Sequence, residues 1–163
     1  MKKIVILGRG GAGKSTLARK LGELLNTPAI ELDKHFWQPG LIPLENAEWI
    51  SIQQKLASRE KWIMDGDLGK YDVLSKRLKY ADTVIILNFP FRICFIRALK
   101  RSKERLDFWI WLFTWRLIEF PKVMKTIKES ASKNTRVIVL KSQNEVEKFI
   151  AGIQNTQPNR KSQ

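Results

Sequence analysis

The chain has 163 residues, of which 44% are hydrophobic and 28% charged, values typical of one globular domain and not of a disordered chain. Cys94 is the single cysteine, which excludes an internal disulfide framework and a zinc site built from several cysteines. Thirty lysines and arginines against sixteen acids give a net charge of +14, which favours polyanionic partners: nucleotide phosphates, nucleic acid or anionic lipid.

The start of the chain is basic and then apolar, but the apolar run from Ile4 to Leu7 is too short for the h-region of a signal peptide. The longest apolar run, from Phe108 to Phe113, is far short of the roughly 20 residues that a membrane span needs. We therefore expect a cytoplasmic protein without a membrane span. The polar end, residues 154–163, has no aromatic residue and is expected to be disordered, which leaves residues 1–153 as one domain.

Short apolar and β-branched runs alternate with helical patterns along the chain. The predicted strands are Lys3–Leu7, Pro28–Leu32, Trp62–Asp65, Thr83–Leu87 and Arg136–Leu140. The predicted helices are Ser15–Leu25, Glu45–Arg59, Tyr71–Tyr80, Phe91–Arg105 and Gln143–Ile153. Strands that are apolar throughout and alternate with helices predict an α/β fold with a parallel sheet covered on both faces.

A glycine-rich motif joins the first predicted strand to the first predicted helix. Residues 8–15 (GRGGAGKS) match G-x-x-x-x-G-K-[ST] at every fixed position. In such a loop, successive backbone amides and the N-terminus of the following helix surround phosphate oxygens. Lys14 adds a positive charge for the β- and γ-phosphates, and the Ser15 hydroxyl is placed to ligate Mg²⁺. The motif therefore predicts binding of ATP and Mg²⁺ by Gly8, Gly10, Gly11, Ala12, Gly13, Lys14, Ser15 and Thr16.

Acidic residues follow two of the predicted strands. Asp33 comes directly after the second strand, and Asp65 ends the third strand and is followed by Gly66 and Asp67. Ligands of an open parallel sheet bind beyond the carboxyl ends of its strands, where an acid can hold Mg²⁺ or accept a proton from a hydroxyl group. We predict a catalytic and metal-binding role for Asp65 and an acceptor contact for Asp33. The alternatives are a turn residue or a helix N-cap.

The only histidine, His35, lies in an aromatic loop with Phe36 and Trp37 that runs to Pro43. This loop is placed to close over an acceptor substrate. A lone histidine in such a loop is more often a packing residue than a catalytic one, so we expect His35 to pack.

Arginines recur along the predicted helix Phe91–Arg105. Arg97, Arg101 and Arg105 are four residues apart, so they project from nearly the same face and repel one another. A bound anion compensates such repulsion, which favours a catalytic clamp by Arg97 and Arg101 on the phosphoryl oxygens. The alternative is a basic face that is simply solvated.

Residues 108–118 (FWIWLFTWRLI) are apolar on nearly every helical face. Such a helix is either buried on all sides or covered by a partner or a membrane surface. We expect core packing together with a homodimer contact. Base stacking on nucleic acid is less consistent with so dense and aliphatic a run.

Taken together, these residues resemble the adenylate-kinase-like P-loop kinases and, more closely, the small bacterial group known as DNA topology modulation proteins. The resemblance extends to about Ile153. It rests on Gly8–Thr16, Leu32-Asp33 with Phe36-Trp37, Trp62–Gly66, Arg77-Leu78 before Ala81-Asp82-Thr83, and Phe89-Pro90 leading to Arg97 and Arg101.

The resemblance implies a three-layer αβα P-loop NTPase fold with a five-stranded sheet of order 2-3-1-4-5 and a short helical lid after the fourth strand. It also implies that Arg97 and Arg101 lie over the adenine and along the phosphates, and that the loop Lys141-Ser142-Gln143 borders the base. The residues expected to contact the acceptor are Asp33, Phe36, Asp65 and Arg77.

The function expected from these residues is transfer of the γ-phosphoryl group of ATP-Mg²⁺ to a small acceptor such as a nucleoside monophosphate. One alternative is a nucleic-acid-associated, DNA topology modulating ATPase or regulator that uses the +14 charge on DNA. Another is a nucleotide-binding module without useful catalysis, whose aromatic helix docks on a partner or a membrane surface.

Overall fold

A computed structural model describes residues 1–101 and 106–156 of the chain. Its main sheet consists of parallel strands: β1 (Lys3–Gly8), β2 (Ala29–Glu31), β5 (Trp62–Asp65), β6 (Thr83–Leu87) and β7 (Arg136–Leu140). The five strands lie in the order β2-β5-β1-β6-β7, which is 2-3-1-4-5 when they are counted along the chain. The predicted α/β fold with a parallel sheet is confirmed.

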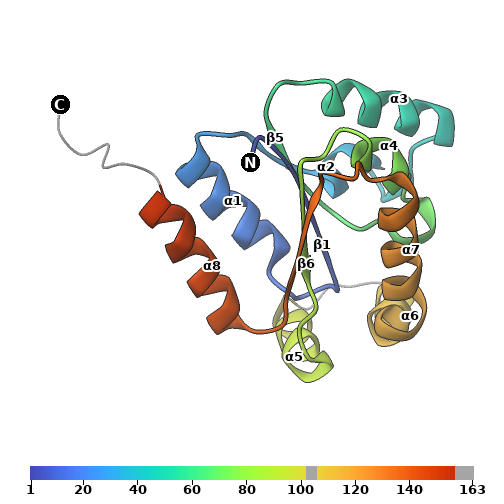
Figure 1. Cartoon of the computed structure of the whole chain (residues 1–163). Coiled ribbons are helices and arrows are strands. Elements are labelled where there is room, and N and C mark those ends of the chain that lie inside the picture. The colour runs from blue at the N-terminus through green and yellow to red at the C-terminus, as the bar shows by residue number, and fades with distance from the viewer. Residues whose placement is uncertain (102–105, 157–163) are drawn as a thin grey trace.

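Helices cover both faces of the sheet (Figure 1). The helices α1 (Lys14–Leu25) and α8 (Gln143–Thr156) lie on one face. The opposite face carries α3 (Asn46–Ala57), α4 (Leu74–Leu78) and α7 (Phe120–Ser130). Between β6 and β7 the chain also forms α5 (Phe91–Arg101), α6 (Leu106–Thr114) and the π-helical turn η2 (Trp115–Glu119). Among the described residues, no helix is both long and apolar enough to cross a membrane.

The central strand β1 shows why the sheet strands are apolar throughout. Val5 and Leu7 pack in one core cluster with side chains of α3, α4 and α7, whereas Ile4 and Ile6 pack in a second cluster with α1, α5 and α8. Successive side chains of a strand point to opposite faces, so a sheet covered on both sides has no position for an exposed polar residue. Full burial of each such side chain contributes roughly 1.5–3 kcal/mol.

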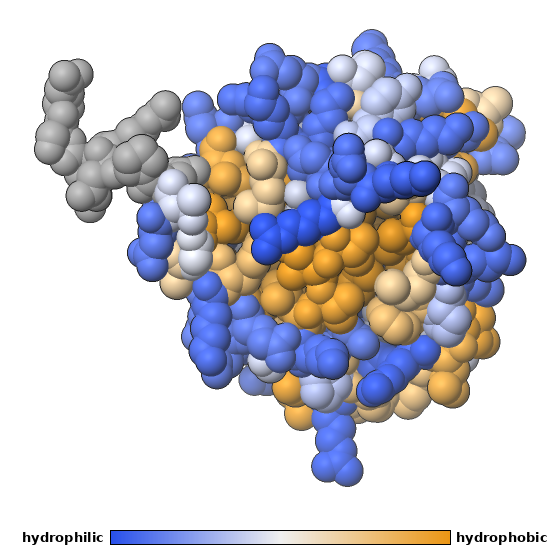
Figure 2. Space-filling view, in the orientation of Figure 1, coloured by the Kyte–Doolittle hydropathy of each residue, from blue (hydrophilic) through white to orange (hydrophobic). Residues whose placement is uncertain are grey.

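The strand β7 forms one edge of the sheet and lies in front of it in Figure 1. The apolar area in the middle of Figure 2 lies over this edge. Val137 is 40% exposed there, whereas Leu140 is buried. The edge is therefore covered only in part by the helices on either side.

The segment after the second strand is more ordered than expected. Residues 32–36 form the short helix α2 (Leu32–Phe36). The residues that follow it in the chain form a hairpin of β3 (Trp37–Gln38) and β4 (Ile42–Pro43). The hairpin turn closes when the Leu41 amide donates to the Gln38 carbonyl at 3.0 Å, with positive φ at Gly40 and Leu41.

The predicted helix Tyr71–Tyr80 is too long at both ends, since α4 spans only Leu74–Leu78. A 3₁₀ turn, η1 (Gly69–Tyr71), lies before it. Gly69 has a φ of 56°, and its amide donates to the Asp67 carboxylate at 3.2 Å. This turn redirects the chain before a longer helix can form.

Two further predicted boundaries need correction. The apolar run 108–118 is not one regular helix, since α6 ends at Thr114 and continues as the π-helical turn. The helix α8 continues to Thr156, past the predicted domain end at 153. Lys103 and Arg105 lie outside the described residues.

Candidate active site

The glycine-rich loop after β1 curls back on itself. Gly8, Gly11 and Gly13 have φ values of 144°, 75° and 95°, in a region that favours glycine. The Ala12 amide donates to the Arg9 carbonyl at 3.1 Å. The Lys14 ammonium donates to the Gly8 carbonyl at 2.9 Å and to the Arg9 carbonyl at 3.4 Å, so its charge lies over the loop. Ser15 and Thr16 follow in the first turn of α1.

The loop is packed closely between two helices that follow β6. A Cβ atom on Gly11 would overlap the backbone carbonyl of Cys94 in α5. A Cβ atom on Gly10 would lie 2.6 Å from two ring carbons of Phe108 in α6. Gly11 is therefore required both by the approach of α5 and by the turn, whereas Gly10 is required by the approach of α6.

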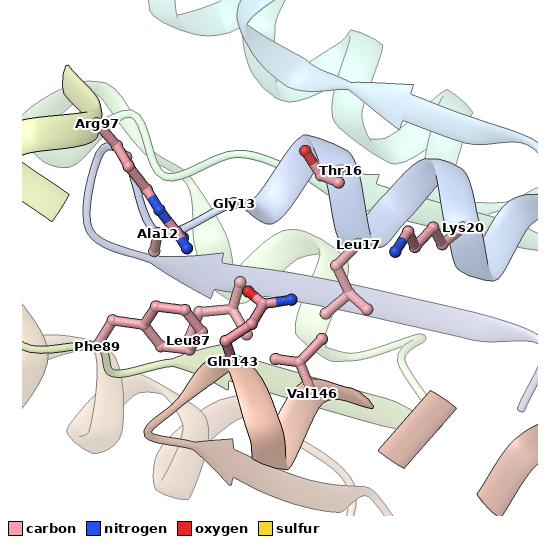
Figure 3. A pocket seen from close by; sticks show the side chains of 11 residues that line it. Ala12, Gly13, Thr16, Leu17, Lys20, Leu87, Phe89, Arg97, Gln143 and Val146 are labelled. Atoms are coloured by element: carbon pink, nitrogen blue, oxygen red, sulfur yellow. The ribbon is translucent and has the colours of Figure 1, made fainter. Parts of the chain in front are cut away.

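A cavity of about 310 Å³ opens on one side of the loop (Figure 3). In the close-up, Arg97 extends toward Ala12 and Gly13, and Gln143 points into the cavity from α8. The remaining wall comes from α1, from the end of β6 and from α8, with Thr16, Leu17, Lys20, Leu87, Phe89 and Val146. An apolar wall beside a phosphate-binding motif, with polar groups at its rim, suits a flat ring that carries a phosphate chain.

Only some of the residues that were predicted to bind the nucleotide line this cavity. The Arg97 guanidinium lies 5.7 Å from the centre of the Phe89 ring, at the end of the cavity next to Gly13. Arg101 is the last residue of α5, and its side chain lies outside the described part of the structure. After β7 it is Gln143 that lines the cavity, whereas Lys141 is exposed and donates its amide to Glu145 at 2.8 Å.

Two acidic residues near Lys14 lie at the end of β5 and just after β2, on one side of β1, whereas the cavity is lined from the end of β6, on the other side. Asp65 is only 3% exposed, and its Oδ1 atom is buried without a hydrogen-bond partner. Burial raises the pKa of the Asp65 carboxyl, while Lys14 and the Ser15 hydroxyl oppose that rise. Asp33 is more exposed as a residue, but burial of its carboxyl group also raises its pKa, again opposed by Lys14. The structure thus brings Lys14, Ser15, Asp33 and Asp65 together.

The donor set fits a magnesium ion that is bound together with phosphates. No group of three or more His, Cys, Asp or Glu side chains within residues 1–101 and 106–156 is arranged to hold a metal alone. Mg²⁺ usually takes one or two protein oxygens and completes its octahedron with water and phosphate oxygens. The Ser15 hydroxyl and the unpartnered Asp65 oxygen are oxygen donors of the kind that such a site needs.

Arg77 does not face an acceptor, and the predicted contact is wrong for this residue. Its side chain is fully buried and forms a two-pronged salt bridge with Asp72, in which Nη2 and Oδ2 are 2.8 Å apart. Arg77 also donates to Gln53 at 3.1 Å and to the Gly66 carbonyl at 3.0 Å. It therefore fixes the loop behind Asp65 from within the protein.

Two residues of α2 differ from their expected surroundings. Phe36 is 1% exposed and packs against Trp37 and Trp49, with ring centres 4.8 and 5.2 Å away. It also lines a second cavity, of about 380 Å³, which lies beside Asp72. His35, which we expected to pack, is exposed.

Aromatic side chains from α6 and η2 cover the loop, which the sequence did not reveal. The centre of the Trp111 ring lies 6.0 Å from the Lys14 ammonium, and its Nε1 atom is buried without a hydrogen-bond partner. Trp115 is fully buried and donates from Nε1 to the Asp67 carboxylate at 3.0 Å. Trp111 and Trp115 are four residues apart, which places both on one helical face. This spacing is the signal in the sequence that could have indicated a shared packing role.

Arg9, inside the loop, is a second residue that the motif did not single out. It is 3% exposed, and its guanidinium lies 5.3 Å from the Phe91 ring and 5.7 Å from the Trp115 ring. Its Nε and Nη1 atoms are buried without partners, and burial lowers its pKa. Arg9 thereby links the loop to α5 and to η2.

No protein-family model matches the chain, and no curated protein matches it significantly. Its fold is similar to that of shikimate kinase from Acinetobacter baumannii in complex with shikimate, at 19% identity and a TM-score of 0.67, over 94% of this chain and 90% of that one. It is also similar to a gluconokinase from Sinorhizobium meliloti 1021, at 20% identity and a TM-score of 0.54, over 94% and 92% of the two chains.

A third similar structure is shikimate kinase from Bacteroides thetaiotaomicron, at 16% identity and a TM-score of 0.57. The match extends over 93% of this chain and 95% of that one. At such identities the similarity concerns the fold alone. The chain therefore has the fold of P-loop kinases.

Proposed function

We propose that this protein is a Mg²⁺-dependent phosphotransferase that moves the γ-phosphoryl group of ATP to a small acceptor. The observation that carries the proposal is the position of Lys14, which has a cavity suited to a nucleoside on one side of its loop and two partly desolvated carboxyl groups on the other. A phosphoryl group on Lys14 would lie between a nucleotide and an acceptor.

The nucleotide side is formed by the loop and the cavity beside it. The loop amides and Lys14 bind the phosphates, and Arg97 lies where the phosphate chain leaves the cavity. The wall of Leu17, Phe89 and Val146 takes up the base. Arg101 remains a predicted partner of the transferred phosphoryl group.

Ser15 and Asp65 would hold Mg²⁺, which supplies charge neutralisation on the phosphate oxygens when bound. The residues of this chain do the positioning. Asp65 is fixed at the end of β5 and backed by Gly66, whose carbonyl is held by Arg77. Asp33 lies close enough to Lys14 and Asp65 to orient an acceptor hydroxyl and accept its proton. Phosphoryl transfer needs little more than such positioning and charge stabilisation.

A hydroxyl acceptor fits the acidic side better than a nucleoside monophosphate. Lys14 is the cation that acts on both carboxyl groups and lowers the pKa of each against the effect of burial. The predicted arginine, Arg77, is already paired with Asp72. An acceptor phosphate would therefore meet two carboxylates, and Lys14 beside them is already engaged by the phosphates of the nucleotide.

The proposal is tested by an assay of ADP release from Mg-ATP with a panel of acceptors. The panel contains nucleoside monophosphates, shikimate, gluconate and neutral polyols, with mass spectrometry of the product. We expect acceptor-dependent ADP release above basal hydrolysis, and its loss in Lys14→Ala. If no acceptor raises the rate in the wild type above that of Lys14→Ala, the phosphotransferase proposal is refuted.

The charge of +14 supports a second candidate, a DNA-associated ATPase like the group that the sequence resembles. Its affinity for duplex DNA should fall steeply with salt, because bound counterions are released. A filter-binding titration at several salt concentrations tests this, and the absence of binding at low salt contradicts it. Membership of that group, a homodimer through residues 108–118 and a cytoplasmic location remain predictions.

A further inference from the structure

The run of α6 and η2 has a second apolar face that residues 1–101 and 106–156 leave exposed. Leu106, Ile110, Phe113 and Leu117 follow one another at spacings of four, three and four residues, and they are 76%, 58%, 56% and 81% exposed. Such spacing places side chains on one side of a helix. The opposite side, with Leu112 and Trp115 fully buried, packs into the protein. The run is therefore apolar on both sides, but buried on only one.

The helix α5 extends this exposed face. Ile93, Ile96 and Leu99 are 40%, 53% and 48% exposed. The two helices are joined by ring contacts, with the centres of Phe91 and Phe113 4.7 Å apart. Figure 2 shows apolar side chains along the lower edge of the molecule, where α5 and α6 lie, between hydrophilic ones. The exposed apolar side chains between Ile93 and Ile118 are called the lid surface below.

The lid surface holds most of the exposed large apolar side chains of the described residues, eight of thirteen. Single exposed apolar residues are ordinary on a protein, whereas a contiguous group of this kind marks an interaction site. A partner that covers it must therefore offer an apolar surface of its own.

Charge selects among the partners that have such a surface. Arg92, Lys100 and Arg116 are exposed within this segment. Residues 91–118 contain seven lysines and arginines against two acids. A second copy would bring equal positive charges together, which opposes association. Nucleic acid would satisfy the charges but leave the aliphatic side chains against a polar backbone. A bilayer with anionic headgroups satisfies both.

We propose that the lid surface docks on an anionic lipid bilayer, with its apolar side chains at the boundary of headgroups and acyl chains and its basic residues on the lipid phosphates. This inference does not depend on the proposed phosphotransferase activity. It assigns a role to the one helical run that also covers Gly10 and Lys14 with its other face. The bilayer would thus contact the element that lies over the glycine-rich loop.

Vesicle flotation of the full chain, without nucleotide, tests the proposal. The vesicles are phosphatidylcholine alone or phosphatidylcholine mixed with phosphatidylglycerol. We expect binding to the mixed vesicles only, and weaker binding at high salt because the charges are screened. The double variant Ile110→Ser, Leu117→Ser should bind about tenfold less tightly. Both side chains are more than half exposed, so the thermal unfolding midpoint should stay near that of the wild type.

The matched control is Leu41→Ser, Ile42→Ser. These residues are 52% and 57% exposed, but they belong to the β3–β4 hairpin. The control should bind mixed vesicles as the wild type does. Equal binding by the two double variants, or equal binding to neutral vesicles, overturns the proposal. So does sedimentation that shows a wild-type dimer, lost in the lid variant, without vesicle binding. Binding to duplex DNA that the lid variant loses, in place of vesicle binding, overturns it as well.

Discussion

Alanine in place of Gly11 should destabilise the protein strongly even when no nucleotide is present. Gly11 has a φ of 75°, and its missing Cβ would overlap the backbone carbonyl of Cys94. Left-handed backbone costs an ordinary residue roughly 1–2 kcal/mol, and forcing an extra carbon into a packed position costs about 1–3 kcal/mol. A carbonyl inside a helix cannot turn away as a side chain can. We therefore expect a loss of about 2–5 kcal/mol in the free energy of unfolding.

Urea unfolding followed by tryptophan fluorescence measures this loss. The midpoint should fall while the dependence of free energy on urea stays the same. The control is Gly152→Ala in α8, because a Cβ atom there has no other atom within 4 Å. Alanine is a better helix former than glycine, so this variant should gain about 0.5–1 kcal/mol.

An unchanged midpoint for Gly11→Ala, together with the expected gain for Gly152→Ala, would refute the close packing of the loop on α5. The glycine would then be required only for phosphate binding, and not by the fold.

Asp65→Asn should lower acceptor-dependent turnover by at least about 100-fold and stabilise the fold near neutral pH by about 1 kcal/mol. Burial raises the pKa of Asp65, so the ionised carboxyl of the wild type costs stability above that pKa. The stability gained by the variant should therefore vanish as the pH falls and the wild-type carboxyl takes up its proton. Thermal unfolding of both proteins at several pH values measures this difference. Arg77→Ala leaves the Asp72 carboxylate buried without its partner and should cost about 3–5 kcal/mol in urea unfolding, a value near zero being evidence against the buried pair. Arg97→Ala should reduce turnover about 100-fold with a smaller loss of ATP affinity. Steady-state kinetics that show a raised KM for ATP with unchanged turnover would place Arg97 in ground-state binding instead.

The sheet and the loop were predictable because local sequence determines them. A strand such as β1, buried on both faces, has to be apolar at every position, and that pattern is visible without any partner. The glycine-rich motif is equally local, since its glycines, Lys14 and Ser15 all lie within residues 8–15.

What could not be predicted depends on residues far apart in sequence. The burial of Arg77 follows from Asp72, Gln53 and the Gly66 carbonyl, which the fold brings together. Within the loop 141–143, the exposed position of Lys141 depends on its amide bond to Glu145 and on where α8 begins after β7. The sequence showed that 108–118 would be apolar on all sides, but the side that faces the loop emerged only with the packing of Phe108 against Gly10.

The central claim is that the loop around Lys14 binds a nucleoside triphosphate. Isothermal titration calorimetry of the full chain with ATP and Mg²⁺, beside Lys14→Ala, tests it most directly. We expect single-site binding by the wild type and at least about tenfold weaker binding by the variant, because a charged hydrogen bond to phosphate is lost. No heat of binding in the wild type, or the same affinity in both proteins, would contradict the claim.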